Sequence, residues 1–283
     1  MNGRTGLCCL IGDPVEHSVS PAMHNSAYQA AGLNYVYLAV KVSKNSLKTA
    51  VEGLKALNVK GINVTTPHKV SILPLLDEVD EEAQSIGAVN TVLNRDGLLK
   101  GYNTDAMGAL KALGREKIEG KNVVILGAGG AARAIATAVG GKCSKLTILN
   151  RTSSRARWLA RRLSKESGLK TGWGSLEDVE RWMNGCQVLI NATSVGMYPY
   201  MEATPIEAKW LKKDMTVFDV VYNPPETKLL REARARGAET VSGLEMLVQQ
   251  GAESIKIWFN VEPKVELMRR AALKALNQMK RVN

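Results

Sequence analysis

Residues Val123-Val124-Ile125-Leu126-Gly127-Ala128-Gly129-Gly130-Ala131-Ala132 decide the fold of this chain. Four apolar residues predict a buried strand, which runs directly into a glycine turn and then into small, helix-forming residues. Glycines at such a turn let the backbone approach a pyrophosphate, and the start of the following helix attracts its charge. The context predicts a dinucleotide-binding turn, with Ala132 as an accepted variant of the third glycine. The alternative is a tight turn without a ligand.

Predicted strands and helices alternate on both sides of this turn, which indicates an α/β architecture with mostly parallel sheets. From this strand onward we expect strands at 122–126, 145–149, 187–192 and 216–221, helices at 131–139 and 154–167, a helix opening at Ser242, and a last amphipathic helix at 267–279. Upstream we expect strands at 6–12, 35–40, 61–64 and 88–93, and helices at 20–32, 46–57, 70–76 and 106–113.

The composition excludes several classes of protein. The chain has 283 residues, 45% of them hydrophobic and 23% charged, which suits an ordinary globular protein of two compact domains. No apolar run approaches the ~20 residues needed to cross a bilayer, and the first ten residues do not resemble a signal peptide, so we expect a cytoplasmic protein. Four cysteines without a C-x-x-C pair and three histidines favour neither a disulfide framework nor a metal site.

The net charge of +11 does not by itself indicate a nucleic-acid partner. The lysines and arginines are scattered through amphipathic helices and form no arginine-rich block interleaved with aromatic residues. We therefore expect no nucleic acid and no membrane among the partners. A smaller anionic ligand is compatible with the same charge.

The segment Asn150-Arg151-Thr152-Ser153-Ser154-Arg155 follows the second predicted strand of the dinucleotide unit and bears on the choice of cofactor. A site for NAD places an acidic residue there, where it binds the ribose 2′-hydroxyl. This chain has two arginines, a threonine and serines instead, and arginine presents forked donors that match a phosphate. The segment therefore predicts NADP, although Arg155 alone would also suit a solvated helix face.

A second informative stretch is Asn63-Val64-Thr65-Thr66-Pro67-His68-Lys69, where an apolar strand ends in a polar turn. Thr66 is a good N-cap and Pro67 suits the first helical position, so the pattern places Lys69 in the first turn of a helix. The backbone amides make that turn partly positive, which disfavours an ammonium group and promotes release of its proton. Lys69 is thus a candidate general acid/base, with a solvated lysine as the alternative.

Four polar segments lie at predicted strand ends: residues 17–21, 65–69, 87–91 and 101–105. Each has a simple structural interpretation; Ser20 suits an N-cap and Asn90 a turn. Together they bring two serine hydroxyls, a threonine, an amide, a carboxylate and a lysine to one sheet edge. That set suits a small ligand with several hydroxyls and a carboxylate.

These motifs resemble the shikimate dehydrogenase family nearly end to end. The resemblance rests on nine motifs in order: H-S-V-S-P, N-V-T-T-P-H-K, G-A-V-N-T, G-Y-N-T-D, G-A-G-G-A, N-R-T-S-S-R, N-A-T-S-V-G, V-Y-N-P and G-L-E-M-L-V-Q-Q. The family's frequent form of the lysine motif differs at Thr66 and His68, but this chain retains Thr65 and Lys69.

The resemblance implies a role for each matched residue. Lys69 would be the acid/base with Asp105 beside it, and the substrate contacts would be Ser18, Ser20, Thr65, Asn90, Asp105, Tyr222 and Gln250. NADP would be held by Gly127, Ala128, Gly129, Gly130 and Ala131 and by Asn150, Arg151, Thr152, Ser153, Ser154 and Arg155. Val220 and Gly243 would line the nicotinamide side, and Glu81 would be a further cofactor contact.

The family fold implies an N-terminal α/β substrate domain of residues 1–105 and a Rossmann-type NADP domain of residues 106–243, with residues 244–283 returning to the first domain. The implied activity is reversible, NADPH-dependent reduction of 3-dehydroshikimate to shikimate, in the pathway to aromatic amino acids. A quinate/shikimate dehydrogenase that uses NAD and a non-catalytic NADP-binding sensor remain as alternatives. A homodimer is left open.

Overall fold

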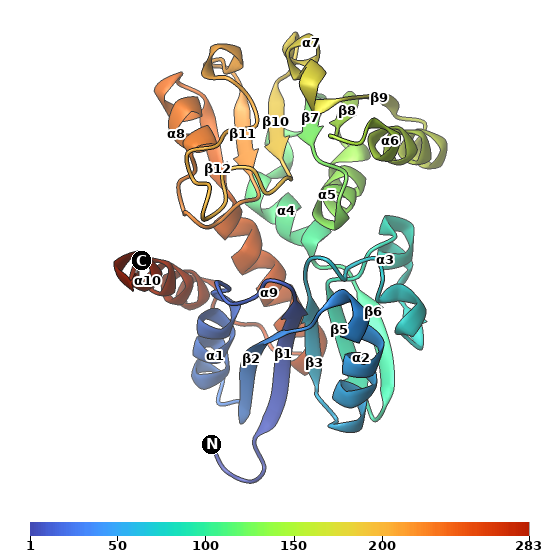
Figure 1. The fold of residues 1–283 in the computed structure, drawn as a ribbon, viewed down its shortest axis with the longest axis vertical. Helices are drawn as coiled ribbons and strands as arrows, with labels where there is room; N and C mark the ends of the chain where they lie inside the picture. The colour runs from blue at the N-terminus through green and yellow to red at the C-terminus, as the bar shows by residue number, and fades with distance from the viewer. Residues whose placement is uncertain (283) are drawn as a thin grey trace. The chain divides into compact units, whose positions relative to one another are not determined.

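The computed structural model describes the backbone of residues 1–282 and the side chains of residues 1–279 (Figure 1). Contacts divide the chain into two compact units. Unit 1 comprises Met1–Asp105 and the residues from Val248 onward, and unit 2 comprises Ala106–Leu247. Each unit is built around its own six-stranded sheet, so the predicted α/β fold class is confirmed.

The sheet of unit 1 is mixed. Its strands lie in the order β2 (Tyr35–Lys41), β1 (Gly6–Gly12), β3 (Gly61–Val64), β5 (Thr91–Arg95), β6 (Leu98–Tyr102) and β4 (Glu78–Val79). β1 is parallel to β2 and β3, whereas β5 runs antiparallel to β3 and β6. The carboxyl ends of β1, β3 and β6 and the amino end of β5 therefore share one edge.

Successive side chains of each strand point to opposite faces of the sheet, and different helices pack on the two faces. Cys9 and Ile11 face the core formed with α2 (Leu47–Ala56) and α3 (Glu81–Ile86). On α9 (Gly243–Phe259), Trp258 lies against β3 and β5. Its indole nitrogen donates to the Val92 carbonyl, and a Cβ on Gly61 would lie 2.3 Å from the ring. Glycine is therefore needed at position 61. α1 (Ser20–Ala30) contacts β2 and α10 (Val265–Val282).

The sheet of unit 2 is parallel throughout. Its strands lie in the order β12 (Glu239–Ser242), β11 (Thr216–Asp219), β10 (Val188–Asn191), β7 (Asn122–Leu126), β8 (Lys145–Leu149) and β9 (Lys170–Gly174). The chain proceeds outward from β7 in one direction and resumes at β10 in the other. The carboxyl ends of β7 and β10 thus form a topological switch point, where open α/β sheets bind ligands.

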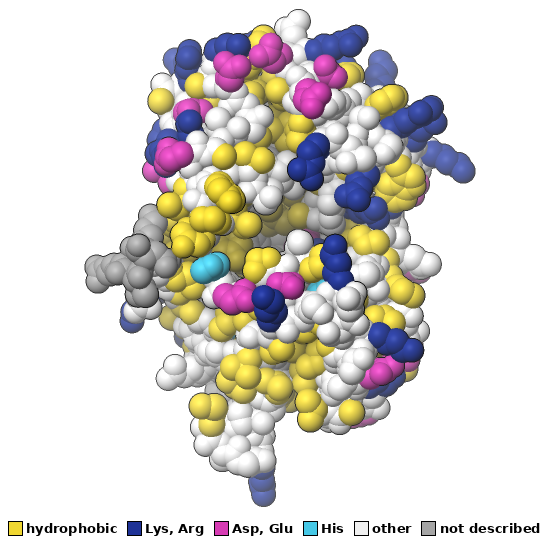
Figure 2. Space-filling view, in the orientation of Figure 1, with side chains coloured by type: hydrophobic (Ala, Val, Ile, Leu, Met, Phe, Trp, Pro, Cys, Tyr) yellow, Lys and Arg dark blue, Asp and Glu magenta, His cyan; other side chains and the backbone are white. Residues whose placement is uncertain are grey.

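Buried residues of both sheet faces form two cores in unit 2. One joins the sheet to α4 (Asp105–Leu113), α5 (Gly130–Gly140) and α6 (Ser153–Ser167), and the other joins it to α7 (Val179–Met183) and α8 (Lys228–Ala235). Lysine and arginine side chains are spread over the visible face of each unit rather than gathered in one block (Figure 2). Within residues 1–282, no helix is both long and apolar enough to span a bilayer.

Several predicted elements are wrong or shifted. The helix expected at 70–76 is only a 3₁₀ turn, Leu73–Leu75. The strand expected at 88–93 is β5, which begins three residues later, at Thr91. The sequence does not predict the short strands β4, β6, β9 and β12 or the helices α3, α7 and α8. Ser20 is not the N-cap of α1 but its first residue, and its amide donates to Ser18 Oγ at 3.2 Å.

His24 is an unusual polar residue in the core of unit 1. Its side chain is 0% exposed and stacks on Tyr37, with ring centroids 4.1 Å apart, while the Trp258 ring lies at 5.6 Å. Neither ring nitrogen has a hydrogen-bond partner in the described part of the chain. Burial without a compensating partner lowers the pKa of His24 to about 3.

This lowered pKa predicts an acid-sensitive core. Between pH 6.5 and about 3 the unfolded chain binds a proton at this position and the folded chain does not, so stability falls as the pH decreases through that window. From pH 7 to pH 4 the loss is about 3 kcal/mol, at ~1.4 kcal/mol per pH unit below the unfolded pKa. His24→Phe should remove that part of the pH dependence, measured by urea unfolding at the two pH values.

The buried Met23 provides the control, because Met23→Leu alters the same core without removing a titrating group and should leave the pH dependence as it is in the unaltered protein. The carboxylates of the chain are common to all three proteins and cancel in the comparison. Equal acid sensitivity in the unaltered protein and in His24→Phe would contradict the prediction.

Candidate active site

The candidate site in unit 1 forms at the shared sheet edge. Lys69 lies in the turn after β3, Asn90 directly precedes β5, and Asp105 follows β6. The antiparallel placement of β5 is what brings Asn90 to the edge where the neighbouring strands end. Residues 36 positions apart in sequence thereby become direct neighbours.

Lys69 and Asp105 form a largely buried ion pair. Lys69 Nζ lies 2.5 Å from Asp105 Oδ2, and the two side chains are 16% and 6% exposed. A buried carboxylate is stable only when paired and hydrogen-bonded, and its second oxygen, Oδ1, accepts from the Asn90 amide at 3.0 Å. The carboxylate therefore holds the lysine ammonium group at a defined point.

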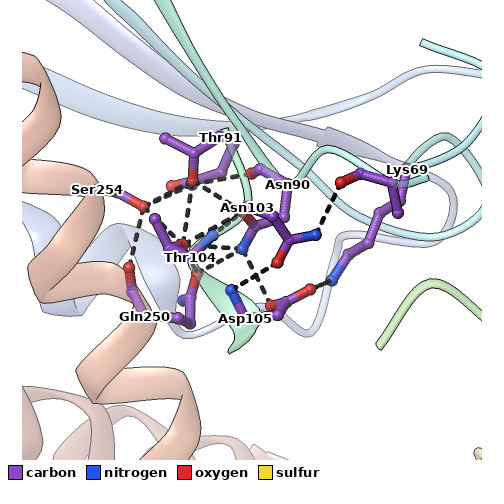
Figure 3. Close-up of polar contacts among 10 residues, drawn as sticks. Lys69, Asn90, Thr91, Asn103, Thr104, Asp105, Gln250 and Ser254 are labelled. Carbon is purple, nitrogen blue, oxygen red and sulfur yellow. Dashed lines mark hydrogen bonds and ion pairs between the residues drawn. The ribbon is translucent and has the colours of Figure 1, made fainter. Parts of the chain in front are cut away.

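Asn90 is the centre of the polar network drawn in Figure 3. Its Nδ2 lies within hydrogen-bond distance of Thr104 Oγ1, Asp105 Oδ1 and Gln250 Oε1, and its Oδ1 accepts from the Thr104 amide at 2.7 Å. The Asp105 amide in turn donates to Asn103 Oδ1. Both functional groups of one asparagine thus connect the end of β6 to α9.

A second layer of polar residues supports this network. Asn63 Nδ2 donates to Thr91 Oγ1 and Ser254 Oγ, while the Tyr37 hydroxyl donates to Asn63 Oδ1 at 2.8 Å. All of these polar groups are buried, and each has a hydrogen-bond partner. The layer therefore adds rigidity to the site without the free-energy cost of an unpaired buried polar group. The sequence does not identify Asn63, Thr91, Thr104 or Ser254 as site residues, because the bonds that join each of them to the network include partners that are distant in the chain.

The prediction that Lys69 lies in the partly positive first turn of a helix, which would promote release of its proton, is wrong. Within the described chain no helix begins at Pro67: residues 66–67 and 69–72 form turns and only Leu73–Leu75 is helical, so no helix start acts on the lysine. The turn is held instead by the His68 ring, whose Nε2 lies 2.7 Å from the Val42 carbonyl oxygen. The Lys69 carbonyl also accepts from the Val89 amide. The lysine itself is placed by Asp105.

The remaining predicted residues of unit 1 lie in the same region of the fold. Ser18 and the buried Ser20 follow β1, and Thr65 follows β3, with its amide bonded to the Ile11 carbonyl. Among the described residues, no hydrogen bond joins these three side chains to Lys69 or Asp105. Gln250 joins the network from α9, whereas Glu81 is an exposed residue at the start of α3.

The candidate nucleotide site of unit 2 begins at the turn between β7 and α5. Gly127 has φ +112°, and a Cβ there would lie 2.8 Å from the Ala192 carbonyl oxygen after β10, so the turn requires glycine. A Cβ on Gly129 would instead meet no heavy atom of the described chain within 4 Å. The start of α5 therefore presents an open face of backbone amides at the switch point, which fits a pyrophosphate.

The segment after β8 also fits the predicted role. Thr152 is the N-cap of α6 but, within the described chain, makes no side-chain capping bond, and no acidic residue occupies the first turn. Arg151 and Arg155 are exposed, and neither forms an ion pair within residues 1–279. Thr152, Ser153 and Ser154 are also exposed, and Asn150 Nδ2 donates to the Thr152 carbonyl.

Val220 and Gly243, predicted as neighbours of one site, are in contact. A Cβ on Gly243 would lie 2.2 Å from the Val220 carbonyl oxygen, so any larger residue would displace that strand end. The preceding Asp219, missed in the sequence, is fully buried and accepts from the Thr227 hydroxyl at 2.6 Å and from the Asn191 amide. Burial raises the pKa of Asp219 to about 6 in spite of these bonds. Tyr222 lies two residues beyond Val220, partly buried.

The two units together define an α/β protein with a dinucleotide-type sheet and a separate ion-paired polar site. Three family models match the chain: the shikimate dehydrogenase substrate binding domain at residues 10–92, the shikimate / quinate 5-dehydrogenase model at residues 109–227, and the shikimate 5'-dehydrogenase C-terminal domain at residues 243–273. The chain therefore belongs to the shikimate dehydrogenase family.

Individual relatives agree. The chain is 48% identical to a shikimate dehydrogenase (NADP(+)) of Methanocaldococcus jannaschii, over 96% of this chain and 98% of that protein. A crystal structure of shikimate dehydrogenase in complex with NADP+ matches with a TM-score of 0.91 and 45% identity, over 98% of this chain and 97% of that one. A quinate dehydrogenase from Corynebacterium glutamicum in complex with NAD matches with a TM-score of 0.87 and 36% identity, over 95% and 99%.

The polar network predicts a large effect of one substitution. Asn90→Ala should destabilise unit 1 by about 2 to 4 kcal/mol, because it leaves the buried Asp105 and Thr104 groups without their partner. Chemical denaturation with a probe in unit 1 measures the loss. The exposed Asn45→Ala is the matched control and should change stability by less than about 0.5 kcal/mol. Equal stability of the two variants would show that the network carries little energy.

Proposed function

We propose that this chain is an NADP-dependent shikimate dehydrogenase, which reduces 3-dehydroshikimate to shikimate with NADPH. The observation that carries the proposal is the buried Lys69–Asp105 pair within a fully bonded polar edge. A lysine that a carboxylate holds in place suits proton transfer to a carbonyl oxygen. The names of the relatives point to the same substrate and cofactor.

The substrate would contact the polar groups of the shared sheet edge. We assign this role to Ser18, Ser20, Thr65, Asn90, Asp105 and Gln250 of unit 1 and to Tyr222 of unit 2. Hydroxyl and amide groups in this number match a ring with several hydroxyls and a carboxylate, since each buried polar group of a ligand needs a partner. Residues 1–105 and 244–283 would then form the substrate domain, and residues 106–243 the cofactor domain.

NADP would bind to residues whose arrangement fits it. The Gly127–Ala131 turn would receive the pyrophosphate, because Gly129 faces open space at the start of α5. Arg151 and Arg155, with Asn150, Thr152, Ser153 and Ser154, would hold the 2′-phosphate, since no acid in the first turn of α6 repels it. Val220 and Gly243 would line the nicotinamide side, and Glu81 would be a peripheral contact.

NADPH held by these residues would supply a hydride for the ketone carbon of the substrate. As the carbonyl π electrons move to oxygen, Lys69 Nζ gives a proton to the forming alkoxide and becomes neutral until solvent restores the proton. Asp105 orients the ammonium group through its 2.5 Å contact, and Asn90 orients Asp105. The protein thus contributes one placed proton donor and a fixed substrate geometry.

Quinate oxidation with NAD is the nearest alternative, because a quinate dehydrogenase shares the fold. The exposed arginines after β8, unopposed by an acid in the first turn of α6, favour NADP instead. A non-catalytic NADP sensor is disfavoured by the intact Lys69–Asp105 pair, which a purely binding protein has no reason to bury. Initial rates for shikimate and quinate with each cofactor distinguish all three.

Lys69→Ala should reduce kcat by about 10²- to 10⁴-fold with little change in KM, because it removes the general acid/base but leaves most binding groups in place. Steady-state oxidation of shikimate, followed by NADPH absorbance, measures both constants. Lys100→Ala is the matched control: Lys100 forms an exposed ion pair with Glu78 in the same unit and should be dispensable. Near-normal turnover of Lys69→Ala would exclude the role.

The double variant Arg151→Ala, Arg155→Ala should lower kcat/KM for NADP by about 10²-fold or more while changing that for NAD less than about threefold, because only NADP has the 2′-phosphate. The ratio of kcat/KM for the two cofactors is the quantity to compare. The matched control is the double variant Arg161→Ala, Lys165→Ala, which removes two exposed positive charges farther along α6 and should leave the ratio unchanged. An unchanged ratio in the first double variant contradicts the assignment.

A further inference from the structure

Two arginines of unit 2 stack on one tryptophan. The guanidinium carbon of Arg133, on α5, lies 4.6 Å from the centroid of the Trp158 ring, and that of Arg162, on α6, lies 5.1 Å from it. Arg155 lies close enough to Arg133 to act on its charge. Three guanidinium groups from two neighbouring helices therefore share one small region.

Without a bound ligand, such a cluster of like charges lowers the stability of the folded protein. Burial lowers the pKa of Arg133, and the positive charges of Arg162 and Arg155 lower it further. The tryptophan is also costly, because 48% of this large ring residue is exposed. Cation–π contacts and the Arg162–Glu166 ion pair at 3.3 Å offset part of the repulsion. A cluster of like charges kept at this cost is typical of an anion-binding site.

The position of Arg133 links the cluster to the nucleotide site. Its backbone amide donates to the Gly129 carbonyl, so Arg133 lies one helical turn beyond the glycine turn. Arg155 belongs to the first turn of α6, in the segment after β8. The cluster thus joins the two segments assigned to the pyrophosphate and the 2′-phosphate. Neither the glycine pattern nor the arginines after β8 identify Arg133 in the sequence.

We propose that Arg133 is a further specificity-determining residue, which binds the 2′-phosphate of NADP together with Arg155, and that Trp158 is a positioning residue that holds the Arg133 guanidinium toward it. This inference rests on the proposed use of NADP. A phosphate monoester is mostly dianionic at pH 7 and relieves the repulsion between the arginines when it binds. The planar ring fixes the guanidinium plane, so less side-chain entropy is lost on binding.

The test measures binding of 2′,5′-ADP and of 5′-AMP by calorimetry, with no substrate present. The two probes differ only in the 2′-phosphate, so the ratio of their Kd values isolates the proposed contact. Arg133→Gln should weaken 2′,5′-ADP about 10- to 100-fold and leave 5′-AMP within about twofold, the range for one charge-assisted contact. Trp158→Leu should weaken 2′,5′-ADP about 3- to 10-fold, and Trp158→Phe, which keeps a ring, should restore most of it.

Arg161→Gln is the control for the overall charge of α6. Arg161 lines the same surface groove as Trp158 and Arg162, but among the described residues only Arg133 and Arg162 stack on the ring. Its loss should change neither Kd by more than about twofold. Equal weakening of both probes by Arg133→Gln would show a structural role and overturn the proposal. So would an unchanged Kd for 2′,5′-ADP, or an effect of Arg161→Gln as large as that of Arg133→Gln.

The unaltered protein separates this inference from the proposed function. If it binds 2′,5′-ADP no more tightly than 5′-AMP, the NADP preference is overturned together with the role of Arg133. If it prefers 2′,5′-ADP but fails to oxidise shikimate, the catalytic proposal fails while the binding result for Arg133 still stands. The pH dependence of 2′,5′-ADP binding adds a measurement that a purely structural role of Arg133 would not change. The difference in Kd between the unaltered protein and Arg133→Gln should shrink below about pH 6, where the phosphate gains a proton.

Discussion

The structure of unit 1 depends on how the Asp105 carboxylate is buried. A carboxylate with 6% exposure is stable only if both oxygens have partners, and here these are the Lys69 ammonium group and the Asn90 amide. The three residues come from three different strand ends, so the carboxylate is satisfied only when β3, β5 and β6 are correctly aligned. The same bonds that complete the sheet edge also place the groups proposed for catalysis.

In unit 2 the proposed site must hold a strongly negative cofactor, so it has to present positive charge. Its parallel sheet places the glycine turn and the arginine segment at the carboxyl ends of adjacent strands, β7 and β8. Gly127 permits the close approach of the turn to Ala192, and the exposed amides at the start of α5 provide partial positive charge. The arginines around Trp158 add full charges, and an anion relieves their mutual repulsion.

The sequence predicted the mainly apolar strands well and the strands of mixed composition poorly. β1, β7 and β8 were predicted with their observed bounds, because each is a largely apolar run between clear turns. β6 and β9 contain lysine, glycine and tyrosine or tryptophan and lack a simple alternation, and their pairing comes from the neighbouring strand. The helix expected after Pro67 failed because good capping residues do not form a helix by themselves when the turn is bonded elsewhere, here through His68 to Val42.

The sequence by itself determined the fold class and the glycine turn, because these follow from local periodicity and backbone freedom, and the resemblance of its motifs to a family pointed to Lys69 and Asp105. Only the tertiary structure decided what positions Lys69, since an ion pair across 36 residues leaves no local pattern. The same holds for Thr104, Ser254 and Arg133, whose roles depend on which elements pack side by side. Local sequence patterns indicate the conformation of the backbone. Which residues distant in the chain contact one another depends on the order of the strands and on the burial of charge.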